Sequence, residues 1–175
     1  PKVAIEKVAS QIDLLLAPAI RRFTPDSLAP IDALAQSSNI NLSPQQLEAI
    51  SASEERAVLA NQAGFSIFAL ARAVYDSIVG KEVGAGGGGG TIAMQLARQV
   101  YYPESIGETD FGRKLNEICM AAAIRSQYSS EEIVKMYAAV TNYGNGITNG
   151  IDAGANYLFG ANSHEELSEA ETIML

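Results

Sequence analysis

Apolar side chains recur along this chain at intervals of three and four residues, the spacing that places them on one face of an α-helix. No alternation of apolar and polar residues, as in a strand, extends beyond about four residues. The pattern therefore predicts an all-α fold. The expected helices cover about residues 8–22, 44–61, 66–80, 92–101, 111–127 and 130–140, followed by two short helices near the C-terminus.

Residues that favour helix ends support these boundaries. The predicted N-caps are Ser43, Thr91, Asp110, Ser129 and Ser163. Each of the three serines is followed, three positions later, by Gln or Glu, which is the spacing of a capping box. Pro44 fits a first helical position, and Gly160 fits the end of a helix that closes near residue 159. His164 lies just inside the last predicted cap, so we expect it to be exposed.

Composition narrows the class of protein. With 175 residues, 47% apolar and 18% charged, we expect one globular domain over residues 1–175. Its net charge of -8 repels phosphate backbones and argues against a nucleic-acid partner. The longest apolar runs have about seven residues, whereas a membrane span needs about 20. Because the chain starts at Pro1, we expect trimmed ends, with any anchor outside this sequence. Cys119, the single cysteine, is predicted to be a small buried hydrophobe.

Glycine dominates residues 84–90, directly before the helix predicted to start at Thr91. The run matches the glycine spacing of dinucleotide-binding turns, but no strand precedes it, so we reject that interpretation. A phosphate-binding P-loop would need a lysine where Gly90 stands. Two interpretations stay open. The run is a mobile loop that brings a phosphate or pyrophosphate to a helix N-terminus, or it is a mobile surface loop without a ligand.

Two groups of charged residues are candidates for chemistry, and each has a structural alternative. Arg113 and Glu117 share one helix face, with Lys114 one position round it. They form either a solvated ion-pair surface or a group of cations that grips a substrate phosphate beside a carboxylate. Glu54 and Glu55 are ordinary surface acids on spacing alone, although a carboxylate made more basic in a cleft would serve as a general base.

Two motifs carry a family resemblance. Residues 88–98 read GGGTIAMQLAR and resemble the GGSTITQQLAR motif of the family 51 peptidoglycan glycosyltransferases, with Thr91, Gln95 and Arg98 kept. That family occurs in class A penicillin-binding proteins and in monofunctional enzymes. The family's RKxxE motif is intact at residues 113–117. Order and spacing make the resemblance specific over about residues 45–175.

The other family motifs assign further residues by resemblance. The first motif holds a catalytic glutamate and ends in an Arg-Ala pair. Anchored without gaps on Arg72, its glutamate falls on Glu55, whereas anchored on the acidic pair it falls on Glu54, and we prefer Glu55. The fourth motif is recognisable over residues 133–144, with Tyr137 in place.

The resemblance implies a lysozyme-like helical domain with a mobile glycine-rich loop, preceded by a helical extension over residues 1–42. It implies transfer of a growing glycan from polyprenyl pyrophosphate to the 4-hydroxyl of a lipid-linked disaccharide, which forms a β-1,4 glycan. Glu55 or Glu54 would be the base, and Glu117 a second catalytic residue. The implied substrate-binding residues are Arg72, Thr91, Gln95, Arg98, Arg113, Lys114 and Tyr137. A divalent metal such as Mg²⁺ is the candidate cofactor, with its ligands unassigned.

The implied setting is the bacterial cell envelope, at the outer face of the cytoplasmic membrane. The implied partners are the lipid-linked precursor, the nascent glycan, the membrane surface and other cell-wall synthesis proteins.

The chain departs from the family pattern at polar positions. The departures are Arg56, Leu59, Gln62, Gly90, Ala93, Met94, Ser130 and Ala139. If each lost contact is worth about 1–3 kcal/mol, three losses would cost about a hundred-fold in rate or far more. Two alternatives therefore stay open: a catalytically inactive homologue that binds glycan or acts as a cell-wall scaffold, and a lysozyme-like lytic enzyme.

Overall fold

The computed structural model describes residues 6, 7, 11, 14, 25–54, 91–103, 111–143 and 149–174. Its helical segments are η1 Pro25–Leu28, α2 Ala29–Ser37, α3 Pro44–Glu54, α5 Ile92–Tyr101, α6 Phe111–Gln127, α7 Ser130–Val140, α8 Ile151–Phe159, η3 His164–Glu166 and α9 Glu169–Met174. Within these ranges the only β pairing is an isolated bridge between Asn142 and Asn149. The predicted all-α, lysozyme-like class is confirmed. None of the described helices combines the length and the apolar character needed to cross a membrane.

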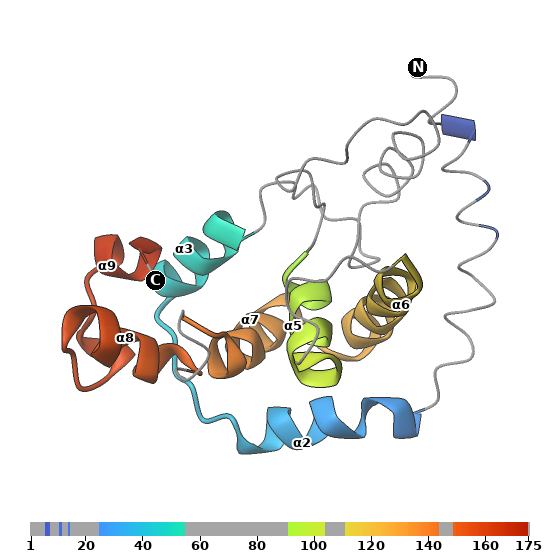
Figure 1. Cartoon of the computed structure of the whole chain (residues 1–175). Coiled ribbons are helices and arrows are strands. Elements are labelled where there is room, and N and C mark those ends of the chain that lie inside the picture. The colour runs from blue at the N-terminus through green and yellow to red at the C-terminus, as the bar shows by residue number, and fades with distance from the viewer. Residues whose placement is uncertain are drawn as a thin grey trace.

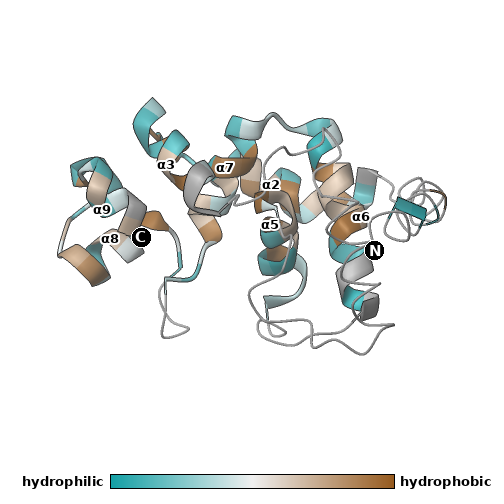
Figure 2. Ribbon diagram, turned by 90° about the horizontal axis from the view of Figure 1, so that it is seen from above, coloured by the Kyte–Doolittle hydropathy of each residue, from teal (hydrophilic) through white to brown (hydrophobic). Residues whose placement is uncertain are grey.

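Helix α5 lies at the centre of the described fold. Helices α6 and α7 pack against it, and α2 runs along one side of this group (Figure 1). Leu96 and Ala97 of α5 have no exposed surface, and neither do Ile31 of α2 and Ile124 of α6. Figure 2 shows the apolar stretches of α2, α5 and α6 gathered in the interior. The core therefore forms around α5, which carries residues 92–98, the IAMQLAR part of the second motif.

Helix α5 begins and ends where the sequence predicts. The Thr91 hydroxyl accepts a hydrogen bond from the Met94 N–H at 3.3 Å, which caps the first turn. The helix ends at Tyr101. Tyr102 leaves helical geometry with a φ of -136°, because the following Pro103 disfavours the α conformation in the residue before it.

Two of the three predicted capping boxes are confirmed. At α7, the Glu132 N–H donates to the Ser129 hydroxyl at 3.3 Å, and the Ser129 N–H donates to the Glu132 carboxylate at 2.8 Å. Hydrogen bonds from the Ser129 side chain and backbone hold the pKa of Glu132 below its ordinary value. At α3, Ser43 and Gln46 exchange the equivalent bonds at 3.0 and 3.2 Å. Both helices therefore start at the predicted residue.

The third predicted capping box is wrong. Ser163 accepts from the Glu165 N–H at 3.0 Å and starts only the 3-10 turn η3, while the Glu166 carboxylate accepts from the Asn162 N–H at 2.9 Å. The capping box forms at Ser168, whose N–H donates to Glu171 at 2.8 Å and whose hydroxyl accepts the Glu171 N–H at 3.3 Å. Both serines have an acid three positions later, so local spacing could not separate them.

The predicted exposure of His164 is also wrong, since only 4% of its surface is accessible. Its imidazole is enclosed by segments that lie far from it in sequence, which cap spacing cannot reveal. Cys119 is buried as predicted, and burial raises the pKa of its thiol.

Residues 25–37, before α3, form η1 and α2. The spacing of apolar residues does not predict separate elements there. Tyr101 donates its hydroxyl to the Ser27 carbonyl at 2.7 Å, and Tyr128 donates to the Asp32 carboxylate. Burial, together with the Asp32 charge, raises the pKa of Tyr101 to about 12, and burial with the hydrogen bond to Asp32 raises that of Tyr128 to about 12. These bonds fix η1 to the last residue of α5, and α2 to the connection between α6 and α7.

Several expectations cannot be followed in the structure. Apart from residues 11 and 14, the helix predicted over residues 8–22 lies outside the described residues. The same is true of the helix over residues 66–80, the glycine-rich loop and the Asp110 cap.

Gly150→Ala is expected to destabilise the domain. The backbone conformation at this position alone costs a residue with a side chain about 1–3 kcal/mol, and we expect a larger loss because the added Cβ also clashes. Gly150 has a φ of 87° and a ψ of 151°, and a Cβ there would lie 2.8 Å from the Ala139 carbonyl oxygen. Gly160→Ala is the matched control, since Gly160 also has a positive φ of 70° but nothing within 4 Å of its Cβ position. In urea denaturation, the free energy of unfolding should be lower for Gly150→Ala than for Gly160→Ala. Equal stabilities would contradict a steric role for the Ala139 carbonyl.

Candidate active site around helix α5

One face of α5 carries polar side chains that are only partly buried. Gln95, Arg98 and Gln99 are intermediate in exposure, whereas Leu96 and Ala97 between them are buried. Residues three and four apart lie on the same side of a helix, so these side chains form one stripe. A polar stripe on the helix that organises the core is the centre of the candidate site.

Glu117 of α6 is a buried carboxylate held by two arginines. Its side chain has 0% exposure. Arg98 donates from Nε to Oε1 at 3.0 Å and from Nη2 to Oε2 at 3.2 Å, which is a bidentate pair. Arg113, four residues before Glu117 on α6, donates from Nη1 to Oε1. Two guanidinium groups, one from α5 and one from α6, therefore converge on a single buried carboxylate.

Both guanidinium groups lie nearer the surface than the carboxylate does. The Arg98 side chain is 30% exposed and the Arg113 side chain 10% exposed, while the carboxylate behind them is fully buried. A carboxylate at the back holds both guanidinium groups in place at low cost in entropy. The arrangement therefore offers a preoriented cation to an anionic ligand.

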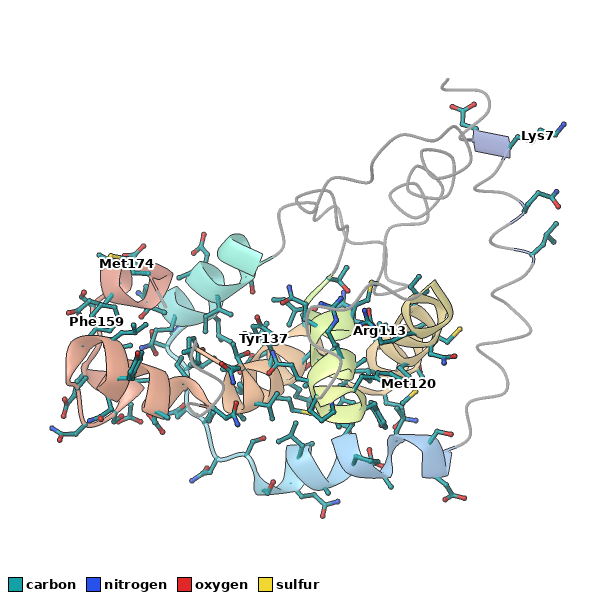
Figure 3. All side chains as sticks on the ribbon, viewed as in Figure 1. Lys7, Arg113, Met120, Tyr137, Phe159 and Met174 are labelled. Carbon is teal, nitrogen blue, oxygen red and sulfur yellow. The ribbon has the colours of Figure 1, made fainter. Side chains whose placement is uncertain are left out.

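Helix α7 completes the polar contacts to α5. The Tyr137 hydroxyl donates to Gln95 Oε1 at 3.2 Å. One turn further along both helices, Gln99 donates to the Thr141 hydroxyl at 3.5 Å, at the limit of hydrogen-bond length. Figure 3 labels Tyr137 of α7, which contacts Gln95 of the stripe, and Arg113 of α6, which contacts Glu117, the partner of Arg98. Residues from three separate motifs thus meet around α5.

The structure brings together five of the ten predicted site residues. Those that meet around α5 are Gln95, Arg98, Arg113, Glu117 and Tyr137. Thr91 lies at the N-terminus of the same helix and caps it.

The remaining predicted residues are described in part or not at all. Glu54 is the last described residue of α3, and Lys114 lies in the first part of α6, but the side chains of both are outside the description. Glu55 and Arg72 lie outside the described residues altogether.

Sequence reasoning missed Gln99. It directly follows the second motif and lies four residues after Gln95, so helical spacing alone could have placed it on the polar stripe. Its neighbour Thr141 comes from the end of α7, which only the tertiary structure brings close.

The donor set around Glu117 suits an anion better than a metal cation. Both carboxylate oxygens of Glu117 already accept hydrogen bonds from guanidinium groups. In the part of the chain that the structure describes, no three His, Cys, Asp or Glu side chains gather as a metal site would require.

Two of the departures from the family pattern lie in the core. Ala93 and Met94 are each 2% exposed and pack inside the hydrophobic cluster rather than along the polar stripe. Ser130 is a surface residue, and its hydroxyl is bonded to Arg125 at 2.7 Å. These substitutions therefore bear on packing and surface contacts more directly than on the stripe.

Comparison with known proteins decides the family. The family model described as transglycosylase matches residues 32–175. The chain belongs to the transglycosylase family. The resemblance drawn from the motifs is therefore confirmed. The transglycosylase match begins within α2. In this helix Ile31 is buried in the core and Asp32 accepts the hydrogen bond from Tyr128.

The similar transglycosylase-family proteins include both single-activity and larger proteins. A monofunctional glycosyltransferase of Staphylococcus haemolyticus is 35% identical over 97 residues, which is 55% of this chain and 33% of that protein. Penicillin-binding protein 1F of Bacillus subtilis is 32% identical over 125 residues, 69% of this chain and 16% of that protein. Penicillin-binding protein 1A of Pseudomonas aeruginosa is 33% identical over 116 residues, 66% of this chain and 13% of that protein. The matched regions thus span a third or less of these relatives.

Proposed function

We propose that this chain is a peptidoglycan glycosyltransferase, which polymerises a lipid-linked disaccharide-peptide precursor into β-1,4 glycan strands and releases polyprenyl pyrophosphate. The observation that carries the proposal is the meeting of Arg98 and Arg113 on the buried Glu117, because it joins the second and third family motifs into one cationic group. The family match over residues 32–175 supports the same activity.

In the proposed reaction, one of the two adjacent carboxylates of the first motif acts as general base. Glu55, or else Glu54, takes the proton from the 4-hydroxyl of the acceptor sugar, since an alcohol needs a positioned base to attack at neutral pH. The acceptor oxygen bonds to the anomeric carbon of the donor as the bond from that carbon to the pyrophosphate oxygen breaks. A single displacement inverts the α-linked donor to a β linkage.

The arginine pair would stabilise the leaving group. Negative charge builds on the pyrophosphate as the glycosidic oxygen departs, and Arg98, Arg113 and Lys114 supply cations there. We assign Glu117 to positioning, because its burial between two guanidinium groups suits holding them better than touching substrate. Thr91, Gln95, Tyr137 and Arg72 are proposed as substrate-binding residues.

A divalent metal such as Mg²⁺ stays a proposal for a site elsewhere in the chain. The oxygens of Glu117 are engaged by arginines, so no step is assigned to a metal at this residue. In the proposed reaction, the two guanidinium groups supply the positive charge that the leaving group needs.

The proposed setting is the bacterial cell envelope, at the outer face of the cytoplasmic membrane. There the chain would meet its lipid-linked precursor, the nascent glycan and other cell-wall synthesis proteins.

The proposal is tested by incubating the purified chain with lipid-linked disaccharide and separating the products by gel electrophoresis. Long glycan chains are the expected result. Soluble fragments released from purified cell wall would instead indicate a lytic enzyme. No product, under conditions where a related monofunctional enzyme works, would favour the inactive glycan-binding or scaffold homologue.

A further inference from the structure

Helix α8 buries one side and exposes the other. Its buried residues recur three and four positions apart, which puts them on one side of the helix. They are Ile151, Gly154 and Ala155. The helix packs against α7 and η3. Away from the buried side, Ala153 and Tyr157 are both exposed and lie one turn apart. Tyr157 is 57% exposed, and Leu158 beside it is 46% exposed.

The polar side chains of α8 are engaged by the chain that follows the helix. Apart from the tyrosine hydroxyl, α8 has two of them, on Asp152 and Asn156. The Asn156 amide donates to the Ala161 carbonyl at 3.2 Å, and Asp152 Oδ1 accepts from the His164 N–H at 2.8 Å. The outer face of α8, defined here as Ala153, Tyr157 and Leu158, is therefore apolar. Exposed apolar residues that are grouped rather than scattered are typical of a contact surface.

Exposed apolar side chains are concentrated at this end of the molecule. Among the described residues, the large apolar side chains that are exposed are those of Leu14, Tyr157, Leu158 and Met174. Three of these four belong to α8 and α9, which lie together at one end of the described fold, opposite α6 (Figures 1 and 2). Figure 3 labels Phe159 and Met174 there. A partner bound at this end would lie away from α6, which carries Arg113 and Glu117.

The same part of the chain carries negative charge without compensating cations. Residues 136–175 contain no Lys or Arg. Their five carboxylates are those of Asp152, Glu165, Glu166, Glu169 and Glu171. In the described part of the chain, no salt bridge joins any of the five to a Lys or Arg. Hydrogen bonds from the Ser168 hydroxyl and N–H hold the pKa of Glu171 below its ordinary value, so this carboxylate is ionised at neutral pH.

Carboxylates border the outer face of α8. Asp152 directly precedes Ala153, and its side chain is 58% exposed. Glu165 and Glu166 are exposed on η3, which packs against α8. An apolar centre with a polar, charged rim is the usual anatomy of a protein–protein contact surface, and tyrosine is enriched at the centre of such surfaces.

The charge at this end favours one kind of occupant. A second copy of the chain would bring the same carboxylates to a symmetric contact, and like charges repel across an interface. An anionic lipid surface would be repelled for the same reason. A protein segment with Lys or Arg side chains beside apolar ones matches both parts of the surface.

We propose that the outer face of α8 is a docking surface for a basic protein partner: Tyr157 and Leu158 make the apolar contact, and the carboxylates of α8 and η3 pair with Lys or Arg side chains of the partner. This inference goes beyond the proposed function and does not depend on it, because α8 carries none of the residues assigned to polymerisation.

Binding of matched helical peptides to the purified chain tests the chemistry of the surface. One peptide has Leu on one face and Lys on the other, a second has Glu in place of Lys, and a third has Ser in place of Leu. By fluorescence anisotropy, the Leu–Lys peptide should bind about ten-fold more tightly than either of the others, and added salt should weaken it because the paired charges are exposed. Equal affinities for the Lys and Glu peptides, or no binding of the Leu–Lys peptide, would overturn the proposal.

Substitutions in α8 locate the binding. Tyr157→Ser and Leu158→Ser should each weaken binding of the Leu–Lys peptide about ten-fold, since each removes an apolar contact at the centre of the surface. Leu14→Ser is the matched control, because Leu14 is also an exposed apolar residue but lies outside α8. Circular dichroism should show the same helix content in all three variants. An equal loss in Leu14→Ser, or no loss in either α8 variant, would contradict docking at α8.

A pair of charge reversals separates the rim from the overall charge of the protein. Glu165→Lys should weaken binding of the Leu–Lys peptide more than Glu131→Lys does, although both change the net charge equally. Glu131 is exposed in the first turn of α7, whereas Gly150, which precedes α8, lies against Ala139 near the other end of α7. Equal effects of the two substitutions would show attraction to net charge alone and would overturn the proposal.

Two further measurements separate the other occupants. Sedimentation of the chain alone should show no dimer that Tyr157→Ser dissociates, and vesicles of phosphatidylcholine and phosphatidylglycerol should bind wild type and Tyr157→Ser alike. A dimer lost in Tyr157→Ser would identify a second copy as the occupant. Vesicle binding lost in the same variant would identify a lipid surface. Either result would replace the basic protein partner.

Discussion

Glu117→Gln is expected to lower the free energy of unfolding by about 3–5 kcal/mol, because it leaves two guanidinium groups together without the buried carboxylate that pairs them. The 30% exposure of Arg98 puts the expectation near the lower end of this range, since solvent screens part of the charge. For a domain of this size each kcal/mol shifts the melting temperature by about 2–4 °C. Thermal and urea denaturation should both detect the change.

A surface ion pair on the neighbouring helix provides the matched control. Lys135 Nζ lies 2.7 Å from Glu131 Oε1, with the same spacing of four residues as Arg113 and Glu117. The Glu131 side chain, however, is 58% exposed. Glu131→Gln should change stability by no more than about 0.5 kcal/mol. If the two variants unfold alike, Glu117 does not hold the arginines in the way inferred. Below its melting temperature, Glu117→Gln should also polymerise poorly, since Arg98 and Arg113 lose their fixed orientation.

Glu55→Gln is expected to lower kcat for polymerisation by about 10²–10⁴-fold, because the acceptor hydroxyl loses its general base. KM for the lipid-linked precursor should change little, since glutamine has nearly the same size and shape as glutamate. Steady-state kinetics with the purified chain measures both quantities. Circular dichroism should show that the helices are retained.

Glu54→Gln is the comparison that separates the two candidates. The helix predicted from sequence over residues 44–61 contains both, and adjacent helical residues point about 100° apart, so we expect only one of them to face the acceptor. Retention of most activity in Glu54→Gln is the expected outcome. The reverse ranking would move the base to Glu54, and full activity in both variants would refute a base at either residue.

The local ends of the helices were predictable from sequence because each depends on a few adjacent residues. Thr91 caps α5, Ser129 with Glu132 caps α7, and Gly160 ends α8 with a φ of 70°. The failure at Ser163 has the same local basis. Ser168 offers an equivalent pair of residues, and the packing of α3 against α9 is not visible in the spacing.

The site was predictable only as a set of residue types. The motifs identified Arg98, Arg113 and Glu117 as candidates, but spacing within one helix could relate only Arg113 to Glu117. The structure shows that Arg98 approaches from another helix and that the Glu117 carboxylate is fully buried. For these reasons Glu117, which the motifs predicted to act on substrate, is assigned to holding the arginines.

By itself, the sequence determined the helical class, most helix ends and the family, because periodicity, capping and ordered motifs are properties of neighbouring residues. Only the tertiary structure decided which charges are buried together and what surrounds His164. Those depend on contacts between residues far apart in the chain, such as Gln46 with His164 and Arg98 with Glu117. Burial then determines whether a charged side chain is a solvated surface group or part of a paired interior cluster.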